Sequence, residues 1–350
     1  MVIRSVIRVP EVVRIKPGAL DRLGLYLYRA SHFQITLFLS AGAPEGPVNQ
    51  ALKSLDQGMI RVQCRIEVVD ASVEEAVEQL SNLPLHCQAI VGLGGGKALD
   101  TAKYVASLAG LPYYAVPTSL SNDGFCSPQS SLTLAGKRKS LVSAMPFAVV
   151  IDTAVCLQAP VELWCSGIGD LAAKFTAVTD WKLAFHAQNT PVNDLAALLS
   201  DATVFQFIGN PERTVKGVKL LATALMLNGM AMEMAGSSRP ASGSEHLISH
   251  ALDVISTRPR LHGLQVGVAA YLVSHLQRGP SKIIAELFEK TGFWDVIRQD
   301  PFQWNEWIGA INLAPILKEG FYTVLSSRDC LPELEQLIET DPWLQGVFIK

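Results

Sequence analysis

The chain has 350 residues, of which 49% are hydrophobic and 17% are charged, and its net charge is −3. Such a composition excludes a disordered chain, and the length is sufficient for two domains with buried cores. No basic run of five or more residues occurs, so neither nucleic acid nor an anionic membrane is expected as a partner.

Residues 1–10 alternate between apolar and polar side chains, which predicts a strand and excludes the apolar core of a signal peptide. No apolar run reaches transmembrane length. The cysteines are scattered through apolar segments, so we expect reduced and mostly buried thiols. They are Cys64, Cys87, Cys126, Cys156, Cys165 and Cys330. These features predict a cytoplasmic protein.

The first part of the chain alternates between strand and helix patterns. Strands are predicted over residues 34–40, 60–69, 88–93, 113–117 and 148–151, and helices over 48–57, 72–80 and 100–109. The helix from Ser72 opens with a capping box that Ser72 forms with Glu75. Alternation of this kind predicts a mostly parallel sheet with helices on both faces.

From about residue 156 the hydrophobic period changes to 3.6 and stays there. Helices are predicted over 195–207, 218–234, 246–255 and 264–276, and no strand is predicted after Asp152. The sequence therefore predicts an α/β domain over residues 1–155 and an all-α domain over residues 156–350.

Three of the seven histidines, His246, His250 and His262, fall within seventeen residues. His246 and His250 are four apart and would project from one face of a helix. Ordinary buried or surface histidines are the alternative, but three at this spacing favour a metal or catalytic site. The zincin pattern is absent because Glu245 precedes the first histidine, and no Cys-x-x-Cys occurs.

An open metal site of imidazoles would need a carboxylate, and Asp170 in Ser166-Gly-Ile-Gly-Asp170 is the candidate. Its alternative role is that of an acidic residue at a helix start, which contributes only about 0.3–1 kcal/mol. Asp170, His246 and His262 would give three ligands and leave positions open for a substrate oxygen.

A glycine-rich segment, Gly92-Leu-Gly-Gly-Gly-Lys97, follows a predicted strand and opens a predicted helix. It satisfies neither Gly-x-Gly-x-x-Gly nor the P-loop pattern. A structural turn would account for two glycines, whereas three at such a junction favour close approach of a pyrophosphate.

A second polar segment, 117–128, follows the strand predicted over 113–117 and should lie at the carboxyl edge of the sheet. Its hydroxyls could bind phosphate or cofactor amide groups. The alternative is a polar loop in which Asp123 forms an Asx turn.

Taken in order, these motifs resemble the sn-glycerol-1-phosphate dehydrogenases, which belong to the superfamily of iron-containing alcohol dehydrogenases, glycerol dehydrogenases and dehydroquinate synthases. The resemblance spans nearly the whole chain. It is carried by Gly94-Gly95-Gly96-x-x-x-Asp100-x-x-Lys103, Pro117-Thr118-x-x-Ser121-x-Asp123-Gly124, Gly169-Asp170-Leu171, Lys174-Phe-Thr-Ala-Val-Thr-Asp-Trp181, Gly243-Ser-Glu-His246-x-x-x-His250 and His262-Gly263-x-Gln265-Val266-Gly267.

The resemblance implies a dinucleotide-binding α/β domain followed by a helical metal- and substrate-binding domain, as in dehydroquinate synthase. It implies NAD or NADP as cofactor, held by Gly94, Gly95, Gly96, Lys97, Ala98, Thr118, Ser119, Leu120, Ser121 and Ser127. It also implies one divalent metal on Asp170, His246 and His262, with Zn²⁺ expected and Ni²⁺ or Fe²⁺ as alternatives. Asp123, Asp170 and His250 would act at the substrate, and His250 or a water would deliver the proton.

The activity implied is reversible NAD(P)H-linked reduction of dihydroxyacetone phosphate, a phosphorylated three-carbon ketone, to sn-glycerol 1-phosphate by a homo-oligomer. A polyol dehydrogenase of the same superfamily and a nucleotide-binding protein without catalysis are the alternatives. Leu264 stands where relatives usually carry Glu after His-Gly, which predicts weaker orientation of the metal ligands. The strand ending at Ser40 has no acidic residue, which predicts loose discrimination between NAD and NADP.

Overall fold

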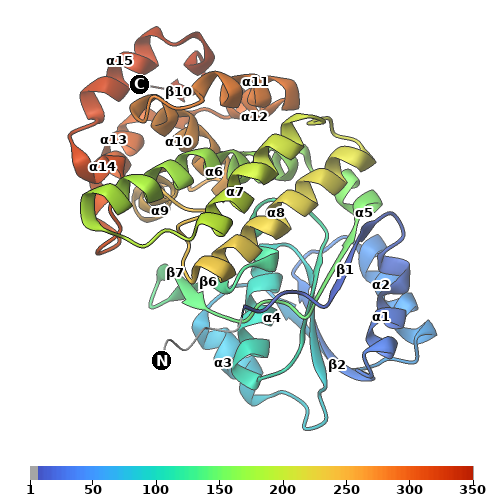
Figure 1. Ribbon diagram of the computed structural model, residues 1–350. Helices are drawn as coiled ribbons and strands as arrows, with labels where there is room; N and C mark the ends of the chain where they lie inside the picture. Colours follow the sequence, from blue (N-terminus) through green and yellow to red (C-terminus); the bar gives the residue numbers. More distant parts are fainter. Residues whose placement is uncertain (1–6, 350) are drawn as a thin grey trace. The chain divides into compact units, whose positions relative to one another are not determined.

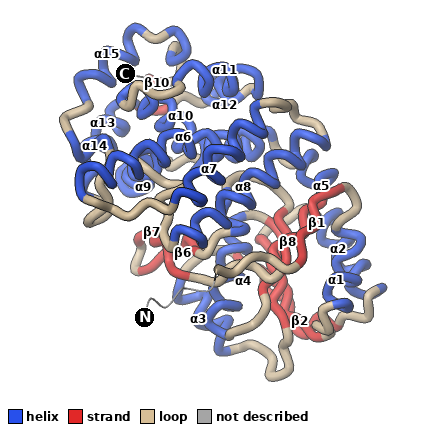
Figure 2. Tube along the Cα trace, in the orientation of Figure 1, coloured by secondary structure: helices blue, strands red, loops and turns tan. Residues whose placement is uncertain are grey.

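A computed structural model describes residues 7–349, which fold into two compact units (Figure 1). The first unit ends at Ala159 and contains a sheet with helices on both faces, and the second begins at Pro160 and is almost entirely helical (Figure 2).

The sheet of the first unit has six strands, and every neighbouring pair is parallel. Its spatial order is β1-β8-β5-β4-β2-β3. The strands are β1 (Val12–Lys16), β2 (Gln34–Ser40), β3 (Arg61–Val68), β4 (Ala89–Gly94), β5 (Tyr113–Pro117) and β8 (Ala148–Asp152). The predicted mostly parallel sheet is confirmed.

Helices α1 (Leu23–Arg29) and α2 (Glu45–Gln57) cover one face of this sheet, and α3 (Val73–Ser81) and α4 (Gly96–Ala109) lie on the other (Figure 1). Alternate strand residues point to the α1–α2 face and form one core with these helices. That core includes Leu23, Leu27, Ile35, Leu37, Leu39, Leu55, Val91, Leu93, Val116 and Val150. The short helix α5 (Thr153–Gln158) ends the unit.

Two predictions about strands were wrong. Of the strand predicted over residues 1–10, residues 1–6 lie outside the described part, and residues 7–10 form no strand. The hairpin of β6 (Gln129–Leu134) and β7 (Lys137–Val142) was not predicted, because β7 is largely charged and exposed. Its turn has positive φ at Ala135 (50°) and Gly136 (75°), as two-residue hairpin turns require.

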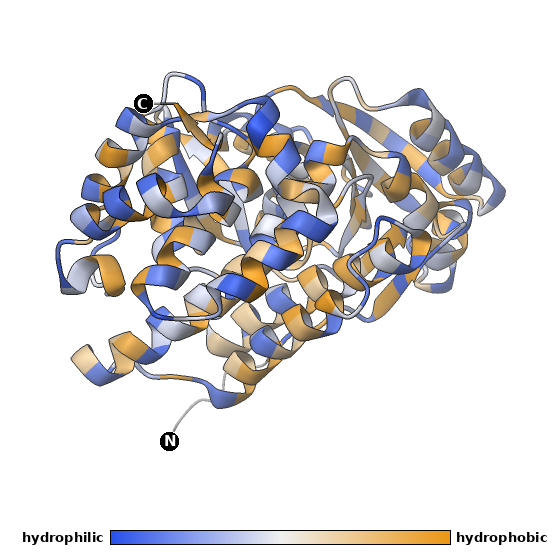
Figure 3. Ribbon diagram, turned by 90° about the horizontal axis from the view of Figure 1, so that it is seen from above, coloured by the Kyte–Doolittle hydropathy of each residue, from blue (hydrophilic) through white to orange (hydrophobic). Residues whose placement is uncertain are grey.

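The second unit packs its helices around α6 (Val161–Gln188), and hydrophobic and hydrophilic residues alternate along them (Figure 3). The others are α7 (Asp194–Ile208), α8 (Val215–Ala235), α9 (Ser244–Ile255), α10 (His262–Leu276), α11 (Ser281–Thr291), α12 (Phe293–Gln299), α13 (Trp304–Leu313), α14 (Val324–Ser327) and α15 (Leu331–Thr340). Two-residue strands β9 (Phe302–Gln303) and β10 (Phe348–Ile349) pair in parallel, so the prediction of no strand after Asp152 was wrong in this detail.

By length and composition, α8 is the one described helix that could cross a membrane, but 56% of its most apolar window is buried inside the protein. The core helix of a soluble domain has the same properties, so α8 is weak evidence for a membrane span.

Close packing of α6 against α10 depends on glycines. A Cβ at Gly169 would meet the Gly263 carbonyl oxygen, and a Cβ at Gly263 would meet the Ser166 carbonyl oxygen. A Cβ at Gly267 would come within 2.8 Å of the Gly169 Cα. Since only glycine permits this approach, the three glycines set the distance between the first turn of α10 and the middle of α6.

Candidate functional site

Three residues from three helices of the second unit form a group suited to a metal ion. Asp170 lies on α6, His246 in the first turn of α9, and His262 is the first residue of α10. One ligand atom from each lies within 4.8 Å of the other two. His246 Nε2 is 3.4 Å from Asp170 Oδ1, and the rings of His246 and His262 have their centroids 5.1 Å apart.

The start of α9 is fixed by two buried carboxylates. Asp180 Oδ2 accepts a hydrogen bond from the Ser244 backbone N–H at 2.7 Å, and Glu245 Oε1 accepts one from the Gly243 N–H at 2.6 Å. A Cβ at Gly243 would lie 2.8 Å from Asp180 Oδ2, so only glycine fits between these two carboxylates. The position of His246 on the first turn is thereby determined.

Glu245 also orients the His246 ring. Its Oε1 is 2.8 Å from His246 Nδ1, and its Oε2 accepts a hydrogen bond from Thr176 Oγ1 at 2.8 Å. A carboxylate on the far nitrogen of a ligand histidine fixes the tautomer and makes the ring a better donor. This role of Glu245 was not predicted from the sequence, because the full burial of its side chain becomes visible only in the structure.

His262 is supported by a hydroxyl. Its Nδ1 is 3.2 Å from Ser249 Oγ, and Ser249 accepts hydrogen bonds from Gln265 Nε2 at its carbonyl oxygen (3.2 Å) and its Oγ (3.0 Å). The ring therefore has an orienting partner even though Leu264, two residues further along, offers no carboxylate to it. The weaker orientation of the metal ligands that Leu264 predicts stays a prediction.

The charges around this group favour a cation. Burial alone would raise the pKa of Asp170, but the Lys174 ammonium 3.5 Å away and the hydrogen bond from His246 outweigh it and hold that pKa well below its usual range. Burial would lower the pKa of His246, but hydrogen bonds to Asp170 and Glu245 raise it. The buried site thus holds carboxylates whose charge a metal would balance in place of a protonated imidazole.

His250 stands beside the group without belonging to it. Its ring centroid is 6.4 Å from that of His246 and 6.0 Å from that of His262, with which it is stacked at 20°. This geometry leaves Asp170, His246 and His262 as the candidate ligand set and puts the third imidazole, that of His250, next to them, where it could reach a bound substrate.

In the first unit, the glycine-rich segment lies where the strand order reverses. Strands β2 and β4 are neighbours in the sheet. The chain leaves β2 through α2 and enters β3 on the far side of β2, and it leaves β4 through α4 and enters β5 on the far side of β4. Open α/β sheets bind ligands at the carboxyl ends of such a strand pair. Here these ends are Ser40 and Gly94, and Ser40 Oγ accepts a hydrogen bond from the Gly95 N–H at 2.8 Å.

The three glycines have different reasons to be glycine. Gly94 has φ 135°, and a Cβ there would meet the Ser40 side chain, so the fold requires it. Gly95 has an extended backbone with φ −91°, and its Cβ would come no closer than 3.8 Å to Ser40 Oγ. A Cβ at Gly96 would meet nothing within 4 Å. The protein alone does not require glycine at 95 or 96, whereas a cofactor phosphate approaching the start of α4 would.

The other predicted cofactor residues lie in the segment after β5. The Thr118 N–H donates to the Gly94 carbonyl oxygen at 3.1 Å, which places Thr118 next to the glycines, and Ser119, Leu120 and Ser121 continue the chain from there. Lys97 and Ala98 lie in the first turn of α4, and Lys97 Nζ donates to the Val69 carbonyl oxygen at 3.3 Å.

Asp123 begins the short helix η2 (Asp123–Cys126), which the buried ammonium of Lys103 holds by donating to the Gly124 carbonyl oxygen at 2.5 Å. Ser127 follows this helix, and its hydroxyl donates to the Gln129 carbonyl oxygen at 2.9 Å. Its predicted contact with a cofactor is untested.

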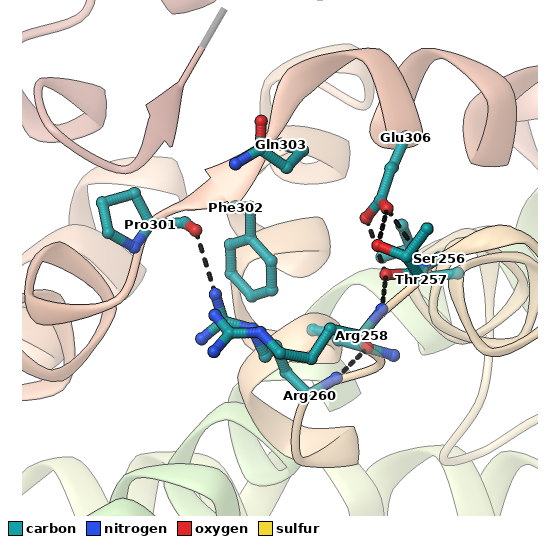
Figure 4. Close-up of a pocket in the computed structure, with 10 residues that line it drawn as sticks. Ser256, Thr257, Arg258, Arg260, Pro301, Phe302, Gln303 and Glu306 are labelled. Atoms are coloured by element: carbon teal, nitrogen blue, oxygen red, sulfur yellow. Dashed lines mark hydrogen bonds between the residues drawn. The ribbon is translucent and has the colours of Figure 1, made fainter.

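A surface pocket of about 340 Å³ lies elsewhere in the second unit (Figure 4). Arg258, Arg260 and Glu306 line it, and Glu306 accepts hydrogen bonds from Ser256 Oγ and from the Thr257 N–H and Oγ1. None of the metal-group residues lines this pocket. Arg258 and Arg260 pair with Asp300, and Glu306 is held by Ser256 and Thr257, so the pocket suggests no chemistry.

Comparison with known proteins gives matches across the chain. A sequence model of the family described as iron-containing alcohol dehydrogenase matches residues 14–160. A glycerol-1-phosphate dehydrogenase (NAD(P)+) of Metallosphaera sedula is 34% identical over 331 residues, which cover 92% of this chain and 93% of the relative. One of Methanosphaera stadtmanae is 35% identical over 274 residues, which cover 77% and 79%.

Among solved structures, a probable glycerol dehydrogenase from Sinorhizobium meliloti 1021 superposes with a TM-score of 0.74 at 19% identity, covering 96% of this chain and 99% of that one. This likeness concerns the fold, and it agrees with the predicted α/β unit followed by a helical unit.

Proposed function

The chain belongs to the glycerol-1-phosphate dehydrogenase family, and we propose that it reduces dihydroxyacetone phosphate to sn-glycerol 1-phosphate with NADH or NADPH and a divalent metal. The observation that carries the proposal is the group formed by Asp170, His246 and His262, in which one carboxylate and two imidazoles converge and each histidine has an orienting partner. This donor set fits an open catalytic site rather than a closed structural one.

The residues fit Zn²⁺, our proposed metal, because two imidazoles and one carboxylate are among its usual ligands. Ni²⁺ and Fe²⁺ accept the same donors. When bound, the metal would act as a Lewis acid on the substrate carbonyl. Glu245 and Ser249 hold the two histidine rings through Nδ1 and so leave Nε2 of each ring for the ion.

When bound, the reduced nicotinamide would supply a hydride to C2 of the ketone; the electron pair of the carbonyl π bond would pass to the oxygen, which would take up a proton. His250 is our proposed proton donor at that oxygen, because its ring lies next to the ligand group without being part of it. Asp123, in the first unit, is proposed to contact the substrate, as the family resemblance implies.

We propose that the first unit holds the cofactor, with its diphosphate at Gly94, Gly95 and Gly96. The support is that residues 95 and 96 are glycine without a need in the fold itself. Ser40, at the end of β2, is bonded to this segment and offers no carboxylate to the adenosine ribose, so both NADH and NADPH are expected to serve. The cytoplasmic location and the homo-oligomeric state stay predictions.

The test is the loss of NADH and NADPH absorbance by the zinc-loaded protein with dihydroxyacetone phosphate or with dihydroxyacetone. We expect turnover with the phosphorylated ketone and little with the other. Preference for dihydroxyacetone would contradict the proposal and indicate a polyol dehydrogenase. Inactivity of the metal-loaded protein with both ketones would contradict any reductase of this class.

A further inference from the structure

Two cations of the second unit share one aromatic ring. The Arg239 guanidinium carbon lies 3.7 Å from the centroid of the Phe321 ring, and Lys318 Nζ lies 3.9 Å from the same centroid. Arg239 belongs to the loop between α8 and α9, whereas Lys318 follows the short helix η3 (Ala314–Ile316). Within residues 7–349, no carboxylate forms an ion pair with either cation.

Arg239 is only 4% exposed, so its lack of an anionic partner is unusual. Its Nη1 donates to the Tyr322 carbonyl oxygen at 2.7 Å, and a guanidinium has five donors to satisfy. Asp180 acts on Arg239 electrostatically, but its two oxygens accept hydrogen bonds from the backbone N–H groups of Ser244 and Val324. Apart from this longer-range effect of Asp180, the protein gives the buried guanidinium no hydrogen-bonded anionic partner among the described residues.

Lys318 adds a second positive charge at the same place. Its Nζ lies 3.2 Å from Ser238 Oγ, and burial of the ammonium together with the charge of Arg239 lowers the pKa of Lys318 to about 8. Two cations that repel each other are held together here, and Lys318 as a whole residue is exposed. An anion could therefore reach the pair from solvent and relieve the repulsion.

The loop that carries Arg239 also leads to the candidate metal group. Its Ala241 carbonyl oxygen accepts a hydrogen bond from Lys174 Nζ at 3.2 Å, and the same Nζ is 3.5 Å from Asp170 Oδ1. Ala241 is two residues from Arg239, so at most about 7 Å of backbone separates them. The loop then enters α9, which carries His246.

We propose that Arg239 and Lys318 bind the phosphate of the ketone substrate and so select a phosphorylated ketone over its unphosphorylated analogue. A guanidinium offers paired N–H donors to phosphate oxygens and an ammonium offers a mobile point charge, which together suit a dianion. Ser238 Oγ, already beside Lys318, could add a further hydrogen bond. The inference rests on the proposed function, since it names the part of the enzyme that recognises its substrate.

The test compares Arg239→Met, Arg239→Lys and Lys318→Met with the wild type, all zinc-loaded. Lys282→Met is the matched control, because Lys282 is an exposed lysine of α11 whose side chain is 88% accessible. Two quantities are measured for each protein. The first is kcat and KM for dihydroxyacetone phosphate, and the second is the shift in melting temperature caused by inorganic phosphate.

We expect Arg239→Met and Lys318→Met to raise KM roughly 10- to 100-fold, because each variant loses a charged hydrogen bond to the substrate phosphate. The change in kcat should be much smaller. Arg239→Lys should recover part of the affinity. Phosphate should stabilise the wild type and the control but not the two methionine variants. Because Lys318 is exposed, its variant reports on binding even if Arg239→Met fails to fold.

Unchanged KM in Lys318→Met and in a folded Arg239 variant would overturn the inference while leaving the reductase activity intact. Phosphate stabilisation that is equal in all the proteins, or absent in the wild type, would also overturn it. A third outcome separates the two proposals. If the wild type does not reduce dihydroxyacetone phosphate, but phosphate stabilises the wild type and not the Arg239 and Lys318 variants, the proposed reaction fails and the anion site stands.

Discussion

Replacing Glu245 with glutamine would remove one charge from behind His246 and leave the hydrogen bonds in place. Oε1 of Glu245 accepts from the Gly243 N–H and lies against His246 Nδ1, and a glutamine oxygen can do the same. Oε2 accepts from Thr176 Oγ1, which also lies 2.9 Å from the Ala173 carbonyl oxygen. Thr176 could donate to Ala173 and accept from the new amide, so Glu245→Gln should fold normally.

The effect on the metal should therefore be electrostatic alone. Loss of a partner behind a metal-ligating histidine weakens metal binding by roughly 10- to 100-fold. We expect Glu245→Gln near the lower end, which is about 1.4 kcal/mol. Glu245→Leu should lie near the upper end, because it also leaves the Gly243 N–H and His246 Nδ1 without their acceptor. The latter variant should also lose about 1–3 kcal/mol of unfolding free energy.

The assay is competition for Zn²⁺ between each protein and a chelator, together with denaturant unfolding of the metal-free forms. Glu335→Gln, at an exposed glutamate of α15, is the matched control and should bind Zn²⁺ like the wild type. Equal Zn²⁺ affinity in the wild type and both Glu245 variants would refute the role of Glu245 in orienting His246.

Three further predictions concern the glycines, the His250 ring and a buried acid. Gly94→Ala should lower the free energy of unfolding by roughly 1–3 kcal/mol in denaturant, because φ at this residue is 135° and the added methyl group would meet Ser40. Gly96→Ala should keep or slightly raise that stability. The same variant should weaken NADH binding measured by fluorescence. Equal NADH affinity for Gly96→Ala and the wild type would argue against a cofactor there. His250→Gln should retain zinc and lower kcat by roughly 100-fold or more, and an unchanged kcat would remove it as proton donor. Burial, together with the charge of Glu245, raises the pKa of Asp180 from 3.8 to about 6, so the folded state favours its neutral form. The resulting stability is present below pH 3.8 and is lost as pH rises through about 6. Asp180→Asn should remove that slope from the unfolding free energy measured against pH, and an unaltered slope would contradict the assignment.

The strands and helices that the sequence predicted well are those with strong local patterns. The strand over Gln34–Ser40 is rich in β-branched and aromatic residues. Ser72 caps the helix α3 by accepting from the Glu75 N–H at 3.1 Å. The hairpin of β6 and β7 was missed because β7 is charged and exposed and lacks the alternation by which half-buried strands are recognised.

The candidate metal group shows where local patterns stop. Helical spacing places His246 and His250 on one face, but nothing local brings Asp170 to them from α6. That approach depends on Gly169 and Gly263, because a side chain at either residue would collide with the facing backbone where α6 and α10 cross. The cation pair of Arg239 and Lys318 was likewise beyond the sequence, because the two residues are 79 positions apart in the chain.

The most direct test of the central claim is metal dependence of dihydroxyacetone phosphate reduction at the proposed ligands. The metal-free protein should be inactive, and activity should rise with added Zn²⁺ to a plateau at about one ion per chain, as expected for a single three-ligand site. His246→Ala should fold, bind NADH and remain inactive at the same Zn²⁺ concentration. Full activity of the metal-free wild type, or of His246→Ala, would contradict the account.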